Sequence, residues 1–432
     1  MNPVDSPANP EQPPAPGGRT ALRSAVLFVN FFLIVTALYH LKPASRSLIL
    51  DTHGTAVLPY VWIGSALTLF VAITLYHRLL DRFERLPVVL GTCLFFILIL
   101  VGFRLLMAAD APGSSVAFYI FVDLFGVVLV EQFWSLTNST YTTRQGKRWY
   151  GLVGTGGLLG GVAGGALSAV LIRGTPLETP DLLLVAALIV GLIFGLTRLM
   201  GQHGMYRELG IRSQGSHPGA WRLFTHSRYL TLIAALLLLA QLGSPLVAFA
   251  FMKVIEGHFP VREALTAALS VFFSILSSVS IAINLAITPL LLRYLGVLAG
   301  LLAQPLVLMA ASAGFMAVPS LVPAAIMKIS DRGLSYSINR ASKELLYIPI
   351  EPTVIYQAKA WIDMFGYRIF KVAGSALIIL LTQWTSLATG RGGLGYVVVA
   401  GCLVWIAVIL RVHREYRQAY ARAPATAADR GG

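Results

Sequence analysis

Apolar runs close to 20 residues long recur about twelve times along this chain of 432 residues, and only 12% of its residues are charged. A soluble globular chain carries about a quarter charged residues. A hydrocarbon core about 30 Å thick needs a helix of about 20 apolar residues to cross it. None of the runs alternates polar and apolar residues as outer-membrane strands do, so helices are the remaining way to satisfy the backbone in lipid. We therefore predict an all-α polytopic membrane protein with about 12 transmembrane helices.

The predicted spans form two groups of six. They are expected at 24–40, 57–76, 87–107, 116–137, 149–172, 181–200, 228–252, 264–288, 295–316, 319–340, 366–385 and 394–412. A long polar segment at 201–227 separates a half at 24–200 from a half at 228–412, with tails at 1–23 and 413–432. Two six-helix halves that close around a midplane site are the layout of the major facilitator transporters. We expect the N-terminal tail, which is rich in Pro, Asn and Ala, to be disordered.

The net charge of +14 is unevenly distributed. Most of the 33 lysines and arginines fall in the two tails and in alternate loops between the predicted spans. This asymmetry follows the positive-inside rule, so we predict a multi-pass protein of the cell (inner) membrane with both termini in the cytoplasm. The alternative is a specific anionic partner for the basic loops. Nucleic acid is not expected as a partner, and a monomer is expected.

Glycines form two rows along the predicted span at 149–172. Gly156, Gly160 and Gly164 make one row, and Gly157, Gly161 and Gly165 make a second row beside it. Small residues four apart let helix backbones approach closely in lipid. A phosphate-binding loop is the alternative, but the Gly-Lys-Ser/Thr ending is absent and no strand precedes the run. Close helix packing is therefore the favoured interpretation.

Acidic residues inside a span point to an aqueous pathway or to a charged partner. A charge at the bilayer centre costs about 2.5–3.5 kcal/mol on insertion scales. Asp123 and Glu131 lie eight residues apart in the span at 116–137. Eight residues differ from two full helical turns by about 80°, so both can share one broad face. They are candidates for coupling or gating, with a structural role as the alternative.

The span at 319–340 carries a polar seam. Its members recur at intervals of three or four and are Lys328, Arg332, Ser335, Asn339 and Ser342. Asp331 lies at the edge of this seam, and the opposite side of the helix is apolar. The seam is predicted to line a central pathway. The alternative is an internal network in which Asp331 pairs with Lys328 and has only a structural role.

Other charged residues allow more than one interpretation. Lys42 and Arg46 follow the first predicted span at helical spacing, where snorkelling to the outer interface is the alternative to a role in a site. Lys359 and Asp363 are spaced for an i, i+4 pair on a juxtamembrane helix. Cys93 and Cys402 fall inside predicted spans and indicate buried hydrophobic positions rather than a disulfide framework.

The sequence carries no constellation typical of a soluble enzyme. Its eight histidines are scattered, with no HExxH motif and no His/Cys cluster at metal-ligand spacing. The G-x-S-x-G motif is also absent. We therefore predict no enzymatic activity, no metal site and no cofactor, and solute transport is the natural use of polar residues within spans.

Two blocks of sequence resemble the ATP/ADP translocase family of plastids and obligate intracellular bacteria, and more closely its short bacterial relatives within the major facilitator superfamily. The first block contains Asp123-Leu124-Phe125-Gly126, Phe133-Trp134-Ser135-Leu136-Thr137-Asn138 and Gly146-Lys147-Arg148-Trp149-Tyr150. The second contains Tyr336-Ser337-Ile338-Asn339-Arg340, Lys343-Glu344-Leu345-Leu346-Tyr347 and Lys359-Ala360-Trp361-Ile362-Asp363. The resemblance extends over most of residues 24–412.

The resemblance implies exchange of nucleotides, typically ATP against ADP, with a few charged residues in the spans as the site. By position it implies Lys42 as the lysine of the first span, Asp123 as the acid of the fourth and Lys371 as the late lysine. A nucleotide polyphosphate carries three or four negative charges and needs several converging cations. Together with the residues above, the predicted substrate-binding set is Lys42, Arg46, Asp123, Lys328, Arg332, Asn339 and Lys371, and the predicted coupling set is Asp123, Glu131 and Asp331.

Three functions follow from these observations. The first is transport of a nucleotide or another phosphorylated anion by alternating access. The second is proton-coupled transport of a non-nucleotide metabolite or drug, with Asp123 or Glu131 as the proton carrier. The third is a membrane scaffold or sensor that transports nothing. Asp123 stands where the exchangers have Glu, and Lys371 follows Ile369-Phe370 where they have a Leu-Gly pair, so substrate choice is the least determined part of the prediction.

Overall fold

The computed structural model describes residues 17–80, 82–206, 227–347, 366–384 and 393–422, together with residues 350, 354, 358 and 362. Within these ranges the secondary structure is helical, and none of the described residues forms a strand. The all-α prediction is therefore confirmed.

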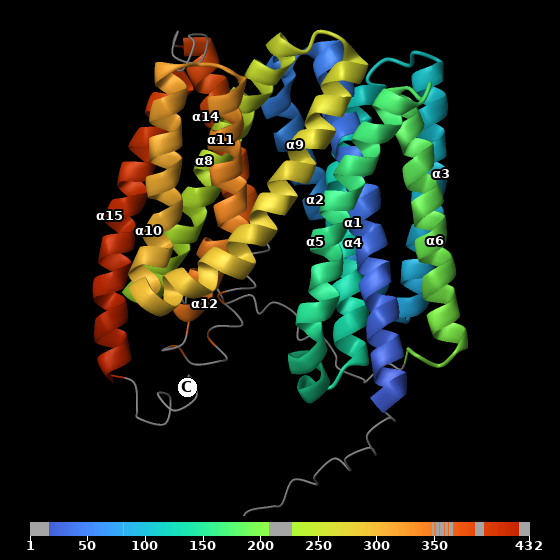
Figure 1. The fold of residues 1–432 in the computed structure, drawn as a ribbon, viewed down its shortest axis with the longest axis horizontal. Coiled ribbons are helices and arrows are strands. Elements are labelled where there is room, and N and C mark those ends of the chain that lie inside the picture. Colours follow the sequence, from blue (N-terminus) through green and yellow to red (C-terminus); the bar gives the residue numbers. More distant parts are fainter. Residues whose placement is uncertain are drawn as a thin grey trace, which may run out of the picture.

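The chain folds into two groups of helices that lie side by side (Figure 1). The N-terminal bundle contains α1 (Gly17–His53), η1 (Thr55–Val57), α2 (Leu58–Leu80), α3 (Arg85–Ala108), α4 (Ser114–Thr140), α5 (Thr143–Gly174), η2 (Thr179–Asp181) and α6 (Leu182–Gln202). The C-terminal bundle contains α8 (Arg228–His258), α9 (Arg262–Ala282), η3 (Ile283–Ile287), α10 (Thr288–Ala317), α11 (Leu321–Leu334), η4 (Ser335–Asn339), α12 (Arg340–Leu345), α14 (Tyr367–Trp384) and α15 (Gly393–Arg422). Helix α9 crosses from the C-terminal bundle toward α1 and α5 (Figure 1).

Nine segments of the described chain are long and apolar enough to cross a membrane. One of them, Arg262–Ala317, is 56 residues long and contains both α9 and α10. A single crossing takes about 20 residues, so this segment is long enough to cross twice. The chain is thus a multi-pass membrane protein, and the number of twelve crossings stays a prediction.

Helices at both ends of the chain extend beyond the spans predicted from apolarity. Helix α1 begins at Gly17, inside the tail expected at 1–23, because Arg23 and Ser24 already bond to Gln145 and Tyr141. Helix α15 continues through Arg422, ten residues into the tail expected at 413–432. Charged residues end an apolar run without ending a helix, since Arg and Glu are good helix formers.

Helix α1 also runs past the predicted end of the first span, at residue 40, as far as His53. Lys42 and Arg46 therefore lie within the helix rather than at its outer interface, which corrects their predicted position. Pro43 interrupts the helix between them and removes one backbone donor. Pro245 lies similarly inside α8, the first helix of the other bundle.

The two bundles pack together at one end. A hydrophobic cluster combines Ile49 of α1 and Trp62 of α2 with Phe251 of α8 and Phe272 of α9. Two further clusters lie almost wholly within one bundle each. Buried Cys93 and Cys402 are both free thiols, as the sequence predicts.

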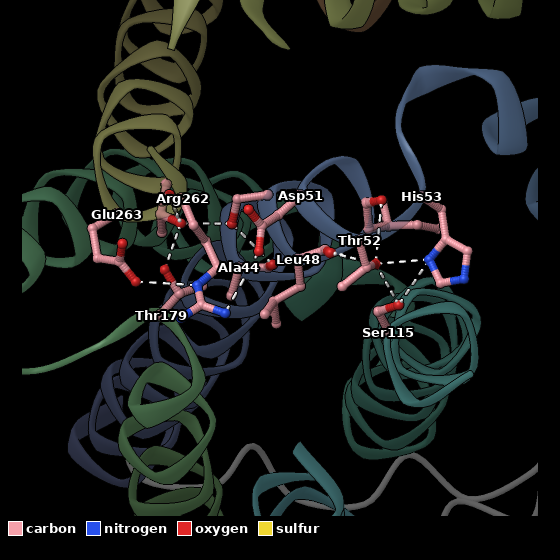
Figure 2. A network of polar contacts seen from close by, with 12 residues as sticks. Ala44, Leu48, Asp51, Thr52, His53, Ser115, Thr179, Arg262 and Glu263 are labelled. Carbon is pink, nitrogen blue, oxygen red and sulfur yellow. Dashed lines mark hydrogen bonds and ion pairs between the residues drawn. The ribbon is translucent and has the colours of Figure 1, made fainter. Parts of the chain in front are cut away.

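Polar contacts at the same end connect the bundles (Figure 2). Arg262 of α9 lies 3.6 Å from Asp51 of α1, and the Thr266 hydroxyl donates to Ser47 at 2.6 Å. The backbone N–H of Thr55 donates to the carboxylate of Glu256 at the end of α8. We call this region, where the end of α1 meets α8 and α9, the joined end.

The two glycine rows of α5 serve different interfaces. The row Gly156, Gly160 and Gly164 packs on the backbone of α1 at Phe28, Phe32 and Thr36. In the second row, Gly157 packs on the Phe31 side chain of α1. Gly161 packs on Ser277 and Gly165 on Ser270 and Ser274, all on α9 of the other bundle. Close packing is confirmed for both rows. Gly161 and Gly165 thus bring α5 close to α9 across the interface between the bundles.

Candidate functional site

An ion pair between α1 and α4 forms the N-terminal side of the candidate site. Arg46 Nη2 donates to Asp123 Oδ1 at 2.9 Å, and both side chains are largely buried. The Arg46 guanidinium also lies 4.5 Å from the centre of the Tyr119 ring, and the Tyr119 hydroxyl accepts from Trp62 Nε1. Lys42, one turn before Arg46, lies 4.7 Å above the Tyr39 ring. Cation–π contacts of this kind help to hold a cation in place away from bulk water.

A second ion-pair group forms the C-terminal side, on α11. Lys328 Nζ lies 3.1 Å from Asp331 Oδ2, and the same oxygen lies 3.7 Å from Arg332 Nε and accepts from the Ser244 hydroxyl at 2.9 Å. Lys328 and Asp331 are 6% and 3% exposed. The alternative predicted for the seam, a pair between these two residues, is therefore present in the structure.

The two sides meet between the bundles. Lys371 of α14 lies 3.7 Å from Asp123 Oδ2, so Asp123 has one cationic partner in each bundle. Arg332 is close enough to interact electrostatically with Lys42, Arg46 and Asp123 of the other bundle. We call the seven residues the central cluster, and they are Lys42, Arg46, Asp123, Lys328, Asp331, Arg332 and Lys371. Its five cations and two carboxylates leave three formal positive charges in excess.

Part of the central cluster is accessible. The side chains of Arg332 and Lys371 are each 33% exposed, whereas Lys328 is nearly covered. A charge that no protein group neutralises is costly in a membrane and is retained where it meets water or a charged solute. An excess of cations with exposed members is therefore suited to bind an anion that carries several charges.

Two predicted site residues lie apart from the central cluster. Glu131 of α4 is exposed, and the residues near enough to interact with its charge include Tyr76 and Arg368. It follows Asp123 by eight residues, or about 12 Å along the helix. Asn339, in η4, is 5% exposed, and its Oδ1 has no partner in the described part of the chain. The predicted pair of Lys359 and Asp363 falls outside the described residues.

Besides Tyr39, sequence reasoning missed three residues that contact the cluster. Ser244 donates to Asp331, Tyr119 packs on Arg46, and Tyr336 accepts from Arg332 Nη1 at 3.5 Å. Serine and tyrosine are common in membrane helices, so their types alone gave no signal. Tyr336 follows Arg332 by four residues, a spacing that places the two side chains next to each other on a helix. This spacing could have identified Tyr336 from the sequence.

The family model described as TLC ATP/ADP transporter matches residues 102–324 and 320–416. The chain belongs to this family. As a member of the TLC ATP/ADP transporter family it is a membrane transporter rather than an enzyme, and the resemblance noted from the sequence is confirmed.

Curated relatives of this TLC family member include ADP,ATP carrier proteins of Chlamydia and Rickettsia species. ADP,ATP carrier protein 1 of Chlamydia muridarum is 24% identical over an alignment of 362 positions, which covers 74% of this chain and 68% of the relative. ADP,ATP carrier protein 3 of Rickettsia felis is 21% identical over an alignment of 374 positions, which covers 73% of each chain. Both alignments cover more than two thirds of this chain and of the relative.

Solved structures place the TLC transporter in the major facilitator fold. The nucleoside transporter NupG has a TM-score of 0.63 at 13% identity, covering 92% of this chain and 98% of its own. The D-xylose-proton symporter has a TM-score of 0.63 at 10% identity, covering 90% and 96%. At such identities the likeness concerns the fold alone, which is that of secondary transporters.

Proposed function

We propose that this protein exchanges nucleotides of the ATP and ADP type across the cell (inner) membrane, and that the central cluster binds their phosphates. The observation that carries the proposal is the excess of three positive charges at the junction of the two bundles. A nucleoside diphosphate or triphosphate carries about three or four negative charges and would neutralise this excess. The names of the curated relatives, ADP,ATP carrier proteins, support the same substrate class.

We infer that the bundles act as the moving units of an alternating-access cycle. One unit would consist of the helices from α1 to α6, and the other of the helices from α8 to α15. With the N-terminus in the cytoplasm, α1 ends at the outer surface, and the joined end is then the closed outer side. On this orientation, the described conformation gives access to the central cluster from the cytoplasm. We further propose that the protein works as a monomer, with one site per chain.

Four cations of the cluster, two from each bundle, have a part in this proposal. Lys42 and Arg46 are held by aromatic rings of the N-terminal bundle, and Arg332 and Lys371 are the exposed cations of the C-terminal bundle. A polyphosphate between them would contact both bundles at once. Asp123 forms ion pairs with Arg46 and Lys371 in the described conformation. Substrate oxygens would therefore compete with its carboxylate for these two cations.

The proposal can be tested by ligand-dependent thermal stability of the purified protein. ATP, ADP, pyrophosphate, a sugar phosphate and a neutral nucleoside are compared. A ligand at 100 times its Kd adds about 2.7 kcal/mol to the folded state. We expect ATP and ADP to stabilise the wild type, and Lys42→Gln and Arg332→Gln to lose that stabilisation.

Arg293→Gln is the matched control, because Arg293 is a cation of α10 that packs on Tyr294 away from the central cluster. Exchange is then measured as uptake of labelled ADP into vesicles loaded with ATP. Absence of stabilisation by any phosphorylated anion, with ADP uptake no higher than in empty vesicles, would refute the proposal. Uptake of another solute driven by a pH gradient would then support the proton-coupled alternative.

A further inference from the structure

We propose that Tyr336 is the surface on which the base of the nucleotide stacks, so that this ring distinguishes nucleotides from polyphosphates that carry no base. The inference rests on the proposed function and extends it from the phosphates to the base. It concerns a residue that lies beside the central cluster and contributes no charge to it.

Tyr336 faces the other bundle. Its hydroxyl accepts from Arg332 Nη1 at 3.5 Å. It is also close enough to Lys42, on α1 of the opposite bundle, for the two groups to interact. A side chain that turned toward lipid could not approach both of these cations. The ring of Tyr336 therefore lies between the bundles.

The ring is open in this position. Tyr336 is 56% exposed, whereas the two residues after it, Ser337 and Ile338, are 1% and 2% exposed. An exposed aromatic ring beside buried neighbours in the middle of a helix presents a flat apolar surface to whatever enters the space between the bundles. Such a surface is what a nucleobase needs for stacking.

Other tyrosines beside the central cluster already have partners on their rings. Lys42 lies over the Tyr39 ring and Arg46 lies over the Tyr119 ring. Tyr39 also makes an edge contact with Phe273, with 6.1 Å between ring centres. Tyr336 contacts its cation through the hydroxyl, so the face of its ring is left for a ligand.

The local backbone supports a fixed position for the ring. Tyr336 is the second residue of η4, a π-helical turn that interrupts the helix between α11 and α12. Single π-helical turns occur frequently at functional sites because they change the direction of side chains within a helix. Here the turn begins three residues after Arg332, so one segment presents both a cation and an aromatic ring.

This arrangement matches two parts of a single ligand. The cations of the central cluster would bind the phosphates, and Tyr336 would stack on the base of the same molecule. Stacking on one aromatic ring is worth roughly tenfold in affinity. A polyphosphate without a base would use the same cations and gain nothing from the ring.

The test compares ADP with pyrophosphate, which supplies phosphate charge without a base. Dissociation constants of both are measured on purified wild type, Tyr336→Phe, Tyr336→Leu and Tyr336→Ala. We expect Tyr336→Ala and Tyr336→Leu to weaken ADP binding about tenfold and to change pyrophosphate binding less than twofold. Tyr336→Phe keeps the ring and should stay within about threefold of the wild type for ADP. Tyr294→Ala is the control, because Tyr294 is an exposed tyrosine of α10 outside the cluster.

Equal losses for ADP and pyrophosphate would overturn the inference, since the effect would then lie in the phosphates or in the fold. Unchanged ADP binding in both Tyr336→Ala and Tyr336→Leu would overturn it as well, while leaving the proposed function intact. If the wild type binds no nucleotide at all, the proposed function fails and this inference fails with it. Tyr336→Leu decides the matter if Tyr336→Ala does not fold, because leucine keeps apolar volume without a ring.

Discussion

Lys371 of α14 reaches across to Asp123 of α4, with 3.7 Å between its Nζ and the Asp123 Oδ2. The two residues are 248 positions apart in the sequence, and each belongs to a different bundle. Asp123 is also bound by Arg46 of its own bundle at 2.9 Å. One carboxylate therefore connects a tight pair within a bundle to a looser pair between bundles.

Removal of either cationic partner of Asp123 should abolish transport, but the two variants should lose different amounts of stability. Arg46→Gln removes a nearly buried pair and a contact with the Tyr119 ring, so we expect a loss of about 1–3 kcal/mol of stability together with loss of transport. Lys371→Gln removes a longer and one-third exposed contact, so we expect less than about 1 kcal/mol of lost stability but a similar loss of transport. Thermal unfolding and ADP uptake into vesicles provide the two measurements. Normal ADP uptake by Lys371→Gln would show that the contact between the bundles has no part in transport.

The two glycine rows of α5 should respond differently to an added methyl group. Gly160→Ala places a Cβ against the backbone of Phe32 within the same bundle, so we expect a loss of about 1–3 kcal/mol of stability. Gly165→Ala places a Cβ 2.8 Å from the backbone oxygen of Ser270 in the other bundle. It should leave the N-terminal bundle folded and favour conformations in which α5 and α9 separate.

Gly151→Ala is the control for both variants, because no atom lies within 4 Å of an added Cβ at that position of α5. Thermal unfolding measures the first effect, and the distance between spin labels on α5 and α9 measures the second. Equal destabilisation by Gly160→Ala and Gly165→Ala, without any change in the label distance, would contradict the separate roles of the rows.

Contacts at the joined end should set the balance between conformations. Asp51 and Arg262 lie 3.6 Å apart, and each is about one-third exposed. An exposed pair contributes about 0.2–1 kcal/mol, which corresponds to a shift in population of up to about fivefold. We expect Asp51→Asn to raise the fraction of molecules that open at this end by such a factor.

The shift can be measured with a membrane-impermeant maleimide added from the side at which α1 ends. Ser335→Cys, beside Tyr336, supplies the thiol, after Cys93 and Cys402 have been replaced by serine. The control is Asp181→Asn, because its pair with Arg104 at 2.9 Å lies within the N-terminal bundle. If Asp51→Asn and Asp181→Asn raise the labelling rate equally, a specific role for the contact with Arg262 is excluded.

Local patterns in the sequence were enough to predict the fold class and much of the candidate site. Apolar runs predict membrane helices because lipid leaves the backbone few alternatives. Asp123, Lys328 and Arg332 could be selected because charges inside a span are costly and need a reason. The two glycine rows could be predicted to pack closely, but their separate partners, α1 and α9, could not.

Helix ends were predicted less well than helix positions. The first span was expected to end near residue 40, and α1 continues to His53 with Lys42 and Arg46 inside it. An apolarity criterion stops at charged residues, whereas a helix stops where its backbone hydrogen bonds stop. The charges of Lys42 and Arg46 are tolerated there because Tyr39, Tyr119 and Asp123 surround them.

The sequence by itself determined that this protein crosses a membrane many times, which family it resembles and which charged residues its spans contain. These properties depend on composition and on spacing along single helices. Only the tertiary structure decided that Asp123 has partners in both bundles and that the ring of Tyr336 is open toward Lys42. Such contacts join residues far apart in the chain, and they depend on the packing of whole helices, which no local pattern specifies.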